Sequence, residues 1–327
     1  MNLYCVVTID TECDRGIKWR NILPVRYTSV TDLIPNVFQK IFTKHLVKPT
    51  YLLSPEVLES KICVDILKSL SAVELGTHLH GEFVEPAKST LGEFTGEIQA
   101  QYSPEMEAVK LGNLTRIFEE KLGFKPTSFR AGRWGISPHT FRILENLGYL
   151  VDSSITPYFM WKFPNYILNY KTAFDVPYFP SRDNFFKQGD MRLLEIPVTI
   201  FSQYGRLMNG YASHLPSLLR NQLMKIPLWR PLWLRPTYSN FSQMKYVIDA
   251  HIASHLEGKD IVFNMMFHSI EILPDENPYN FNKKRIELFI NSIEQTFEYL
   301  SLRGVKFLGL TDIYPIFKHK ESDAFRY

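Results

Sequence analysis

Two histidines with metal-ligand spacing end an apolar run in the first third of the chain. His78 and His80 are two residues apart, so on an extended segment their imidazoles share one face and can bind one metal ion. Asp10 and Glu12 have the same spacing after an earlier apolar run. One carboxylate beside two imidazoles suits Zn²⁺ or a similar divalent ion that keeps positions open for water and substrate. The alternative is two unrelated loop histidines and solvated loop acids.

Further charged residues could supply acid–base chemistry around such an ion. If Glu12 is the acidic ligand, Asp10 is free to accept a proton from water, and the reverse assignment stays open. Arg130 in FRAGRWG is a cation that would keep Asp10 ionised, or an ordinary surface arginine. His268 ends the run VFNMMFH, where it is either a proton donor to a leaving group or a hydrogen-bonded core histidine.

Three nearby residues are candidates for substrate binding. Trp134 offers either a platform for a sugar ring or a core side chain. Arg133 precedes it and fits a surface position as well as a binding one. Asp152, in a predicted strand, suits a supporting role at the site or a buried structural role.

From residue 156 to about 240 the chain is rich in proline, aromatic and basic residues, with one clear strand over 193–200. We expect this insertion to select the substrate, because insertions on the loop face of a barrel change specificity. Its segment IPLWRPLWLRP could bind a sugar ring and a phosphate, or meet a membrane surface, or pack its tryptophans on the barrel. The residues concerned are Trp229, Arg230, Trp233 and Arg235.

Short apolar runs alternate with helical patterns over most of the chain. Strands are predicted over 3–9, 49–53, 73–79, 127–131, 149–155, 193–200, 261–267 and 306–310, and helices over 33–42, 106–122, 141–147, 244–255 and 285–302. Ser-Pro pairs at 54–55, 103–104 and 137–138 predict helix starts. This alternation predicts a parallel sheet, closed or nearly closed into a barrel, whose strand ends gather the candidate groups on one rim. We expect one barrel domain over 1–315 and a C-terminal tail over 316–327.

Composition limits the function classes. The 327 residues are 45% hydrophobic and 22% charged, which is typical of a globular protein. A net charge of +3 gives no reason to expect a nucleic-acid partner. Three scattered cysteines predict no disulfide framework, and neither a signal peptide nor a membrane span is apparent. We therefore expect a cytoplasmic protein; its oligomeric state is not indicated.

Five segments in order, TIDTE, ELGTHLHGEF, FRAGRWG, LGYLVDSSI and FNMMFHSIEILP, resemble the motifs of the polysaccharide deacetylases, the NodB-homology carbohydrate esterases. The likeness is greatest to their WalW-type branch. The resemblance implies a distorted (β/α)7 barrel and a divalent metal, usually zinc. It implies that Asp10 is the catalytic base, His78 a metal ligand, Arg130 the partner of the base and His268 the catalytic acid.

The chain also departs from the family pattern. Members commonly have adjacent aspartates where this chain has Asp10-Thr11-Glu12, and they space the two histidines four apart rather than two. A proline is usual where Gly132 stands. These differences shift the acidic ligand to Glu12 or change the coordination.

The resemblance implies a hydrolase that removes an N-acetyl or N-formyl group from an amino sugar in surface polysaccharide or lipopolysaccharide biosynthesis. Without an export signal, a nucleotide- or lipid-linked sugar precursor is the expected substrate, with possible peripheral contact to the inner membrane. Two alternatives remain. One is an inert sugar-binding relative; the other is an amidohydrolase-type barrel, which places its histidine pair on the first strand.

Overall fold

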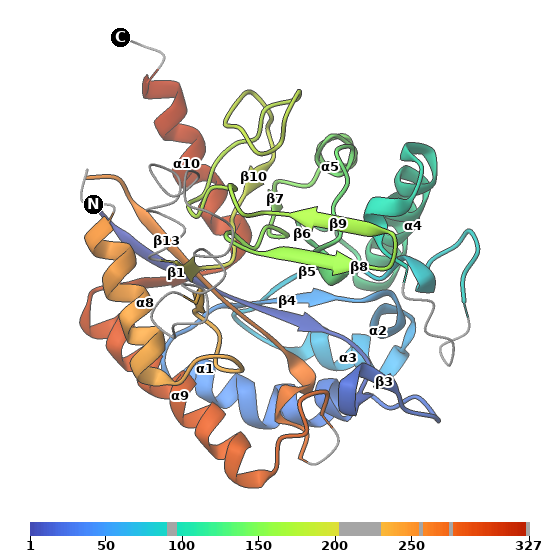
Figure 1. Cartoon of the computed structure of the whole chain (residues 1–327). Helices are drawn as coiled ribbons and strands as arrows, with labels where there is room; N and C mark the ends of the chain where they lie inside the picture. The colour runs from blue at the N-terminus through green and yellow to red at the C-terminus, as the bar shows by residue number, and fades with distance from the viewer. Residues whose placement is uncertain (90–96, 203–229, 255–257, 275–276, 325–327) are drawn as a thin grey trace, which may run out of the picture.

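The computed structural model describes residues 1–89, 97–202, 230–254, 258–274 and 277–324. Its centre is a parallel sheet in the order β10-β7-β6-β5-β4-β1-β13, with β14 also paired to β1 (Figure 1). Each strand lies where a run was predicted, because apolar β-branched segments covered on both faces favour a parallel sheet, but the strands predicted over 149–155 and 193–200 are only two residues long. They are β1 (Leu3–Thr11), β4 (Pro49–Leu53), β5 (Glu74–Leu79), β6 (Ser128–Ala131), β7 (Val151–Asp152), β10 (Leu194–Glu195), β13 (Ile261–His268) and β14 (Lys306–Leu308).

The two edges of this sheet approach each other without forming a ladder between β10 and β13. Thr199, just after β10, donates its backbone N–H to the carbonyl of Asn264 in β13 at 3.0 Å. The Asn264 N–H returns a bond to Thr199 Oγ1 at 2.7 Å. A few hydrogen bonds thus replace a strand pair at the seam, and the predicted distorted barrel is confirmed.

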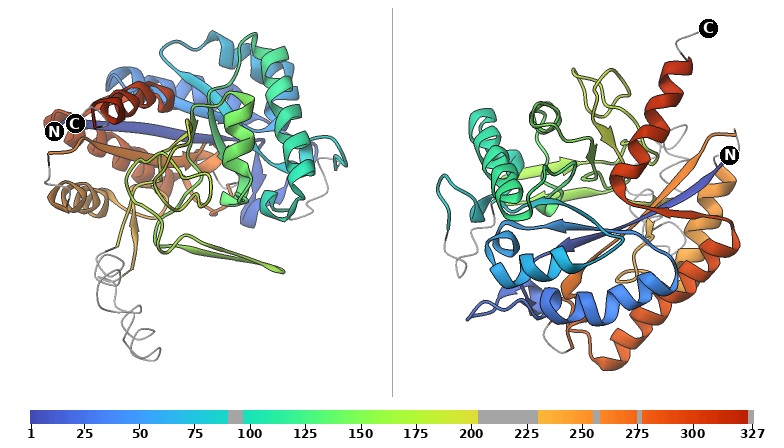
Figure 2. Two further views of the ribbon diagram at one scale, coloured as in Figure 1. Left: turned by 90° about the horizontal axis from the view of Figure 1, so that it is seen from above. Right: turned by 180° about the vertical axis from the view of Figure 1, so that it is seen from behind.

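Helices surround the sheet (Figure 2). Their buried positions follow the helical period; in α9 they include Ile286, Phe289, Ile293, Phe297 and Leu300. The helical segments are the π-helix η2 (Ser29–Phe38), which continues into α1 (Gln39–Lys44), then α2 (Pro55–Glu59), α3 (Lys61–Ser69), α4 (Pro104–Leu122), α5 (Thr140–Leu147), α8 (Phe241–Ser254), α9 (Lys283–Leu302) and α10 (Leu310–Ala324). None of the described helices is long and apolar enough to cross a membrane.

The three Ser-Pro pairs do not all cap helices. Ser103 accepts a hydrogen bond from the Met106 N–H at 3.2 Å and caps α4. Ser54 instead donates its hydroxyl to the Thr11 carbonyl at 3.1 Å. The hydroxyl of Ser137 bonds to a buried carboxylate, and α5 begins later, at Thr140. Ser137 Oγ also accepts from the His139 N–H at 2.9 Å, so the hydroxyl caps the turn at 138–139 and the helix starts two residues later than the pair at 137–138 predicted.

The region predicted as an insertion is divided by barrel strand β10. Before β10, the hairpin β8 (Met160–Phe163) and β9 (Tyr166–Asn169) projects from the barrel (Figure 2). After it, β11 (Ile200–Phe201) pairs with β12 (Leu232–Trp233). Residues 203–229, including Trp229, lie outside the described residues. Helix α10 continues across residue 316, where the sequence suggested a boundary between barrel and tail.

Candidate active site

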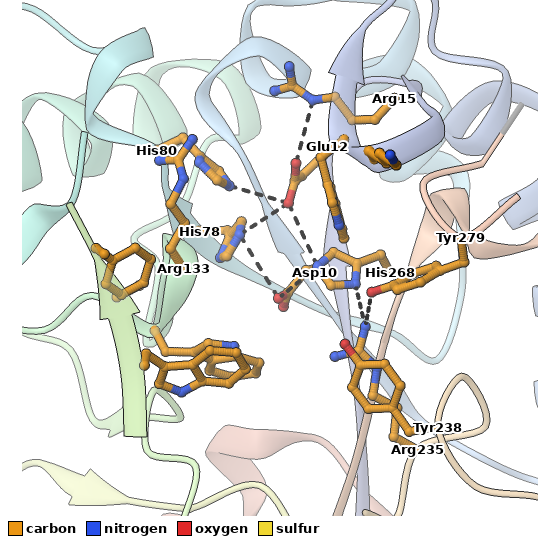
Figure 3. A pocket seen from close by; sticks show the side chains of 16 residues that line it. Asp10, Glu12, Arg15, His78, His80, Arg133, Arg235, Tyr238, His268 and Tyr279 are labelled. Carbon is orange, nitrogen blue, oxygen red and sulfur yellow. Dashed lines mark hydrogen bonds and ion pairs between the residues drawn. The ribbon is translucent and has the colours of Figure 1, made fainter. Parts of the chain in front are cut away.

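The polar candidates meet at one end of the barrel, around a cavity of about 400 Å³ (Figure 3). Asp10 pairs in register with His268 across β1 and β13, and His78 pairs with Arg130 across β5 and β6. Each stands at or next to the C-terminal end of its strand. Aromatic side chains complete the lining: Trp19, Trp134, Trp161, Phe163, Tyr238 and Tyr279.

Glu12, His78 and His80 form a compact buried cluster with metal-binding atoms. One ligand atom from each lies within 4.8 Å of the others. Glu12 Oε1 is 3.4 Å from His78 Nε2 and 3.3 Å from His80 Nε2. Asp10 lies farther out, with Oδ2 3.9 Å from His78 Nε2. Of the two acids left open by the sequence, the geometry favours Glu12 as the ligand.

The other ring nitrogens test whether this cluster fits a metal ion. His78 Nδ1 lies 3.0 Å from the Arg130 carbonyl, to which it can donate, so Nε2 is left as the ligand atom. His80 Nδ1 is buried and forms no hydrogen bond within the described part of the chain; Glu82 Oε1 is 3.8 Å away. Glu82 is in turn bound by Arg133 at 2.5 Å. Two oriented imidazoles and a carboxylate fit a divalent ion such as zinc.

The charges within the cluster are mutually dependent. Burial opposes ionisation of Glu12, but His80 and His78 outweigh that cost and lower the pKa of Glu12 well below its usual value. Burial also opposes a charged His80, yet Glu12 raises the pKa of His80 to about 9. In the metal-free protein a proton on His80 therefore compensates Glu12, a role that a metal cation could take over.

Arg130 lies beneath the cavity and is fully buried. Its Nη1 donates to Asp10 Oδ1 at 2.7 Å, and its Nη2 donates to Thr8 Oγ1 at 2.8 Å. Ser153 accepts two more bonds, at 2.7 Å to its carbonyl and 2.9 Å to its hydroxyl. These contacts fix the guanidinium, so Arg130 is a positioning residue for Asp10 rather than a surface arginine.

Asp10 has one oxygen bound and one directed toward the cluster. Oδ1 accepts from Arg130, while Oδ2 lies 3.7 Å from His268 Nε2. Burial opposes its ionisation, but Arg130, His78 and His268 together lower the pKa of Asp10 below its usual value. Asp10 is thus an ionised carboxylate with one oxygen free to accept a proton.

His268 stands beside Asp10 on the cavity floor, at the end of the neighbouring strand β13. Its Nδ1 lies 2.9 Å from Glu271 Oε1, which leaves Nε2 toward the cavity. Glu271 is the third residue of the short turn η8 (Ser269–Ile272) and is fully buried. Glu271 was not among the residues predicted from the sequence, although an acid three residues after His268 was a usable signal.

Arg235 lines the cavity, but its guanidinium is bound by buried side chains of the protein. The side chain is 2% exposed, and Nη2 donates to Glu271 Oε1 at 2.7 Å and to Tyr279 Oη at 2.8 Å. Its guanidinium carbon lies 4.5 Å from the centre of the Tyr238 ring. The sequence suggested phosphate binding by Arg235; the structure places this arginine behind His268, neutralising Glu271.

Of the remaining residues predicted from the sequence, Trp134 and Arg133 line the cavity and Asp152 does not. Trp134 lines the cavity and stacks on Trp161, with ring centroids 6.4 Å apart. Arg133 reaches the cavity while bound to Glu82. Asp152 is fully buried outside the cavity lining and accepts bonds from the Ser154 N–H and hydroxyl.

Gly132 explains part of the packing behind the metal cluster. A Cβ at this position would clash with the Leu79 carbonyl and would lie 3.1 Å from the His80 ring. Glycine therefore lets β5 and the turn η5 (Gly132–Trp134) approach closely. The proline common in the family pattern would not have this freedom.

Several solved structures share the fold of this chain. No family model matches the sequence, and no curated protein matches it. A candidate glycoside hydrolase or deacetylase from Parabacteroides distasonis has a TM-score of 0.61 at 12% identity, covering 97% of this chain and 71% of the other. A candidate polysaccharide deacetylase from Mycobacterium smegmatis has a TM-score of 0.51 at 16% identity, covering 98% and 92%. The Puue allantoinase has a TM-score of 0.55 at 14% identity, covering 96% and 89%. At these identities the likeness shows a shared fold, the barrel type that the sequence predicted.

Proposed function

We propose that the protein is a metal-dependent hydrolase that removes an N-acyl group from an amino sugar. The observation that carries the proposal is Asp10, which is held at Oδ1 by Arg130 and directs Oδ2 toward His268, beside a separate Glu12–His78–His80 cluster. A metal site with an adjacent carboxylate that is not needed as a ligand suits hydrolysis, which requires a proton acceptor for water.

In this mechanism Glu12, His78 and His80 hold the divalent ion, for which zinc is our assignment. When bound, the ion would supply Lewis acidity toward the acyl carbonyl oxygen and the attacking water. Asp10 accepts the proton of that water on Oδ2. Arg130 keeps Asp10 ionised and fixed while the proton is transferred.

His268 is assigned as the acid on the leaving-group side. Protonated at Nε2, it can donate to the departing amine, while Nδ1 stays bound to Glu271. Arg235 neutralises Glu271 and fixes its position, so it acts on His268 indirectly. Asp10 Oδ2 lies 3.7 Å from His268 Nε2, so the base and the acid stand side by side on the cavity floor, where one can accept a proton from the water and the other can donate a proton to the leaving amine.

A sugar is the favoured substrate because the cavity combines this polar floor with aromatic walls, which suit the apolar faces of sugar rings. The fold neighbours described as deacetylases support the same class. We further propose a WalW-type enzyme that acts in the cytoplasm, peripheral to the inner membrane, on a nucleotide- or lipid-linked precursor for surface polysaccharide or lipopolysaccharide. Deacetylation and deformylation both fit the site.

The test is acyl release by zinc-reconstituted protein from N-acetyl and N-formyl amino sugars, offered as free sugars, sugar 1-phosphates and nucleotide-linked sugars. We expect equal amounts of carboxylic acid and free amine from at least one substrate. Asp10→Asn should lose this activity, and His139→Gln, a change at an exposed histidine of the α5 N-cap, should keep it. Tight sugar binding without acyl release under any metal condition would instead favour the inert sugar-binding alternative.

A further inference from the structure

Two short turns with the same construction lie against the cavity. Each has a cation followed by a tryptophan, and both residues of each pair adopt left-handed backbone conformations. In η1 (Ile17–Trp19), Lys18 has φ 58° and Trp19 has φ 64°. In η5, Arg133 has φ 54° and Trp134 has φ 60°. Non-glycine residues rarely adopt this conformation, and such residues cluster at binding sites.

The two cations differ in what they bind. Arg133 is paired with Glu82 at 2.5 Å and also donates to the Glu97 carbonyl at 2.7 Å. Arg15 and Arg235, the other cations of the lining, are also paired with buried acids. Lys18 is exposed, and within the described ranges its ammonium has neither an ion pair nor a hydrogen bond. Among the described residues, Lys18 is therefore the cavity-lining lysine or arginine whose charge is not neutralised by a carboxylate.

The backbone around Lys18 is nevertheless fixed. The Lys18 N–H donates to the Pro278 carbonyl at 2.9 Å. The adjacent Trp19 ring packs edge-on against His268, with centroids 4.7 Å apart, and against Tyr279 at 5.8 Å. These contacts attach the turn to the catalytic side of the cavity, so the Lys18 side chain starts from a defined point on its rim.

We propose that the cavity binds an amino sugar bearing an anionic substituent, a phosphate or a carboxylate, and that Lys18 contacts this group. The inference rests on the proposed function and names the substrate class. The buried acids of the site already have partners: Asp10 is bound by Arg130, Glu12 lies against His78 and His80, and Glu82 and Glu271 are bound by arginines. The Lys18 ammonium is thus available for a charge-assisted bond to the ligand. Trp161 and Phe163 of β8 line the same cavity and offer apolar surface for the sugar ring.

Strand β8 also provides a matched control. Side chains alternate along a strand, so Lys162, between Trp161 and Phe163, points to the other face. It is exposed and does not line the cavity. Lys162→Gln removes the same charge as Lys18→Gln from a neighbouring element.

The experiment compares three probes on the zinc-reconstituted protein: N-acetylglucosamine, its 1-phosphate and N-acetylmuramic acid, whose acid is a carboxylate. Kd is measured by calorimetry at low ionic strength, and KM and kcat are measured for any probe that is turned over. Lys18→Gln should weaken binding of at least one anionic probe about tenfold, leave the neutral probe unchanged and leave kcat unchanged. The phosphate and carboxylate arms show which anion is bound.

Lys18→Glu should extend the loss for the anionic probe, and Lys162→Gln should match wild type with all three. The inference is overturned if no anionic probe binds at millimolar concentration, or if Lys18→Gln affects neutral and anionic probes equally or not at all. Lys18-dependent anion binding without any acyl release would contradict the proposed hydrolase and leave this site standing. Acyl release that does not depend on Lys18 would support the proposed hydrolase and overturn the proposed anion site.

Discussion

The floor and the wall of the cavity are built in different ways. The polar floor consists of Asp10, Glu12, His78, His80 and His268, with Arg130 directly beneath it, and all six are buried at or next to the ends of sheet strands. The aromatic wall consists of Trp19, Trp134, Trp161, Phe163, Tyr238 and Tyr279, which come from turns, a projecting hairpin and loops. The floor is fixed by strand pairing, whereas the wall depends on segments that connect strands.

We infer from this difference that the floor carries out the chemistry and the wall selects the substrate. Charges in the floor are held by specific partners, which preorganises them at low cost during the reaction. The wall offers apolar surface, and beside it lies Lys18, whose ammonium has no ion pair among the described residues. Variants of the floor should therefore change metal binding and kcat, and variants of the wall should change KM.

The largest effect is expected at Asp10. Asp10→Asn keeps the side-chain volume but removes the proton acceptor, so kcat should fall about 10²- to 10⁴-fold. Metal content and substrate Kd should stay near wild type, because Glu12 is the proposed ligand. Steady-state kinetics with metal analysis checks this. Loss of metal in the variant would show that Asp10 is a metal ligand. An unchanged kcat would show that Asp10 is not the proton acceptor.

A second effect tests the buried acids behind the floor. Burial, with Asp152 nearby, raises the pKa of Glu195 well above its usual value. A raised folded-state pKa means that wild type loses stability as pH rises from the unfolded-state pKa, about 4.3, toward the folded one. Glu195→Gln avoids this loss and should gain up to about 1.4 kcal/mol of relative stability per pH unit in that window.

Urea denaturation at pH 5, 6 and 7 measures this gain. Glu287→Gln, at an exposed position of α9, is the control and should track wild type. A constant difference between Glu195→Gln and wild type across these pH values would show that Glu195 does not titrate abnormally.

An intermediate effect is expected from Glu82, which lies 3.8 Å from the free nitrogen of His80. Removing the charge in Glu82→Gln should weaken zinc binding about 10- to 100-fold, as for other partners of metal-bound imidazoles. Competition with a chromogenic chelator gives the affinity. Equal zinc affinities of Glu82→Gln and wild type would mean that Glu82 interacts with Arg133 and does not support His80 as a ligand.

The smallest effect is expected in the wall. Trp161→Ala should raise KM for a sugar substrate about 2- to 10-fold with little change in kcat, because it removes stacking surface and no charged group. Ile167→Ala, on the exposed face of the same hairpin, is the control. A fall in kcat without a change in KM would contradict the division between floor and wall.

The sequence predicted the floor better than the wall. Asp10, His78, Arg130 and His268 follow or end apolar runs, and the parallel-barrel interpretation alone brings such strand ends together. The helix and strand pattern of the barrel could be predicted for the same reason, since periodicity reports burial directly.

Partners that depend on tertiary contacts could not be predicted in this way. Spacing gave no sign that Arg235 is paired with Glu271, so its charge appeared available for phosphate. Trp19 lies in the short turn η1, where no period indicates which side chains face a cavity. Trp161 lies in the four-residue strand β8, which was not predicted from the sequence. The Ser137 hydroxyl likewise bonds to Glu107, far from it in sequence.

The most direct test of the metal-dependent floor is the zinc content of the purified protein after reconstitution and removal of free metal. Wild type and His139→Gln should each bind one equivalent, and His78→Gln and His80→Gln should each lose it while keeping the wild-type circular dichroism spectrum. Full zinc occupancy in both cluster variants, or none in wild type, would contradict the central claim that Glu12, His78 and His80 form the metal site.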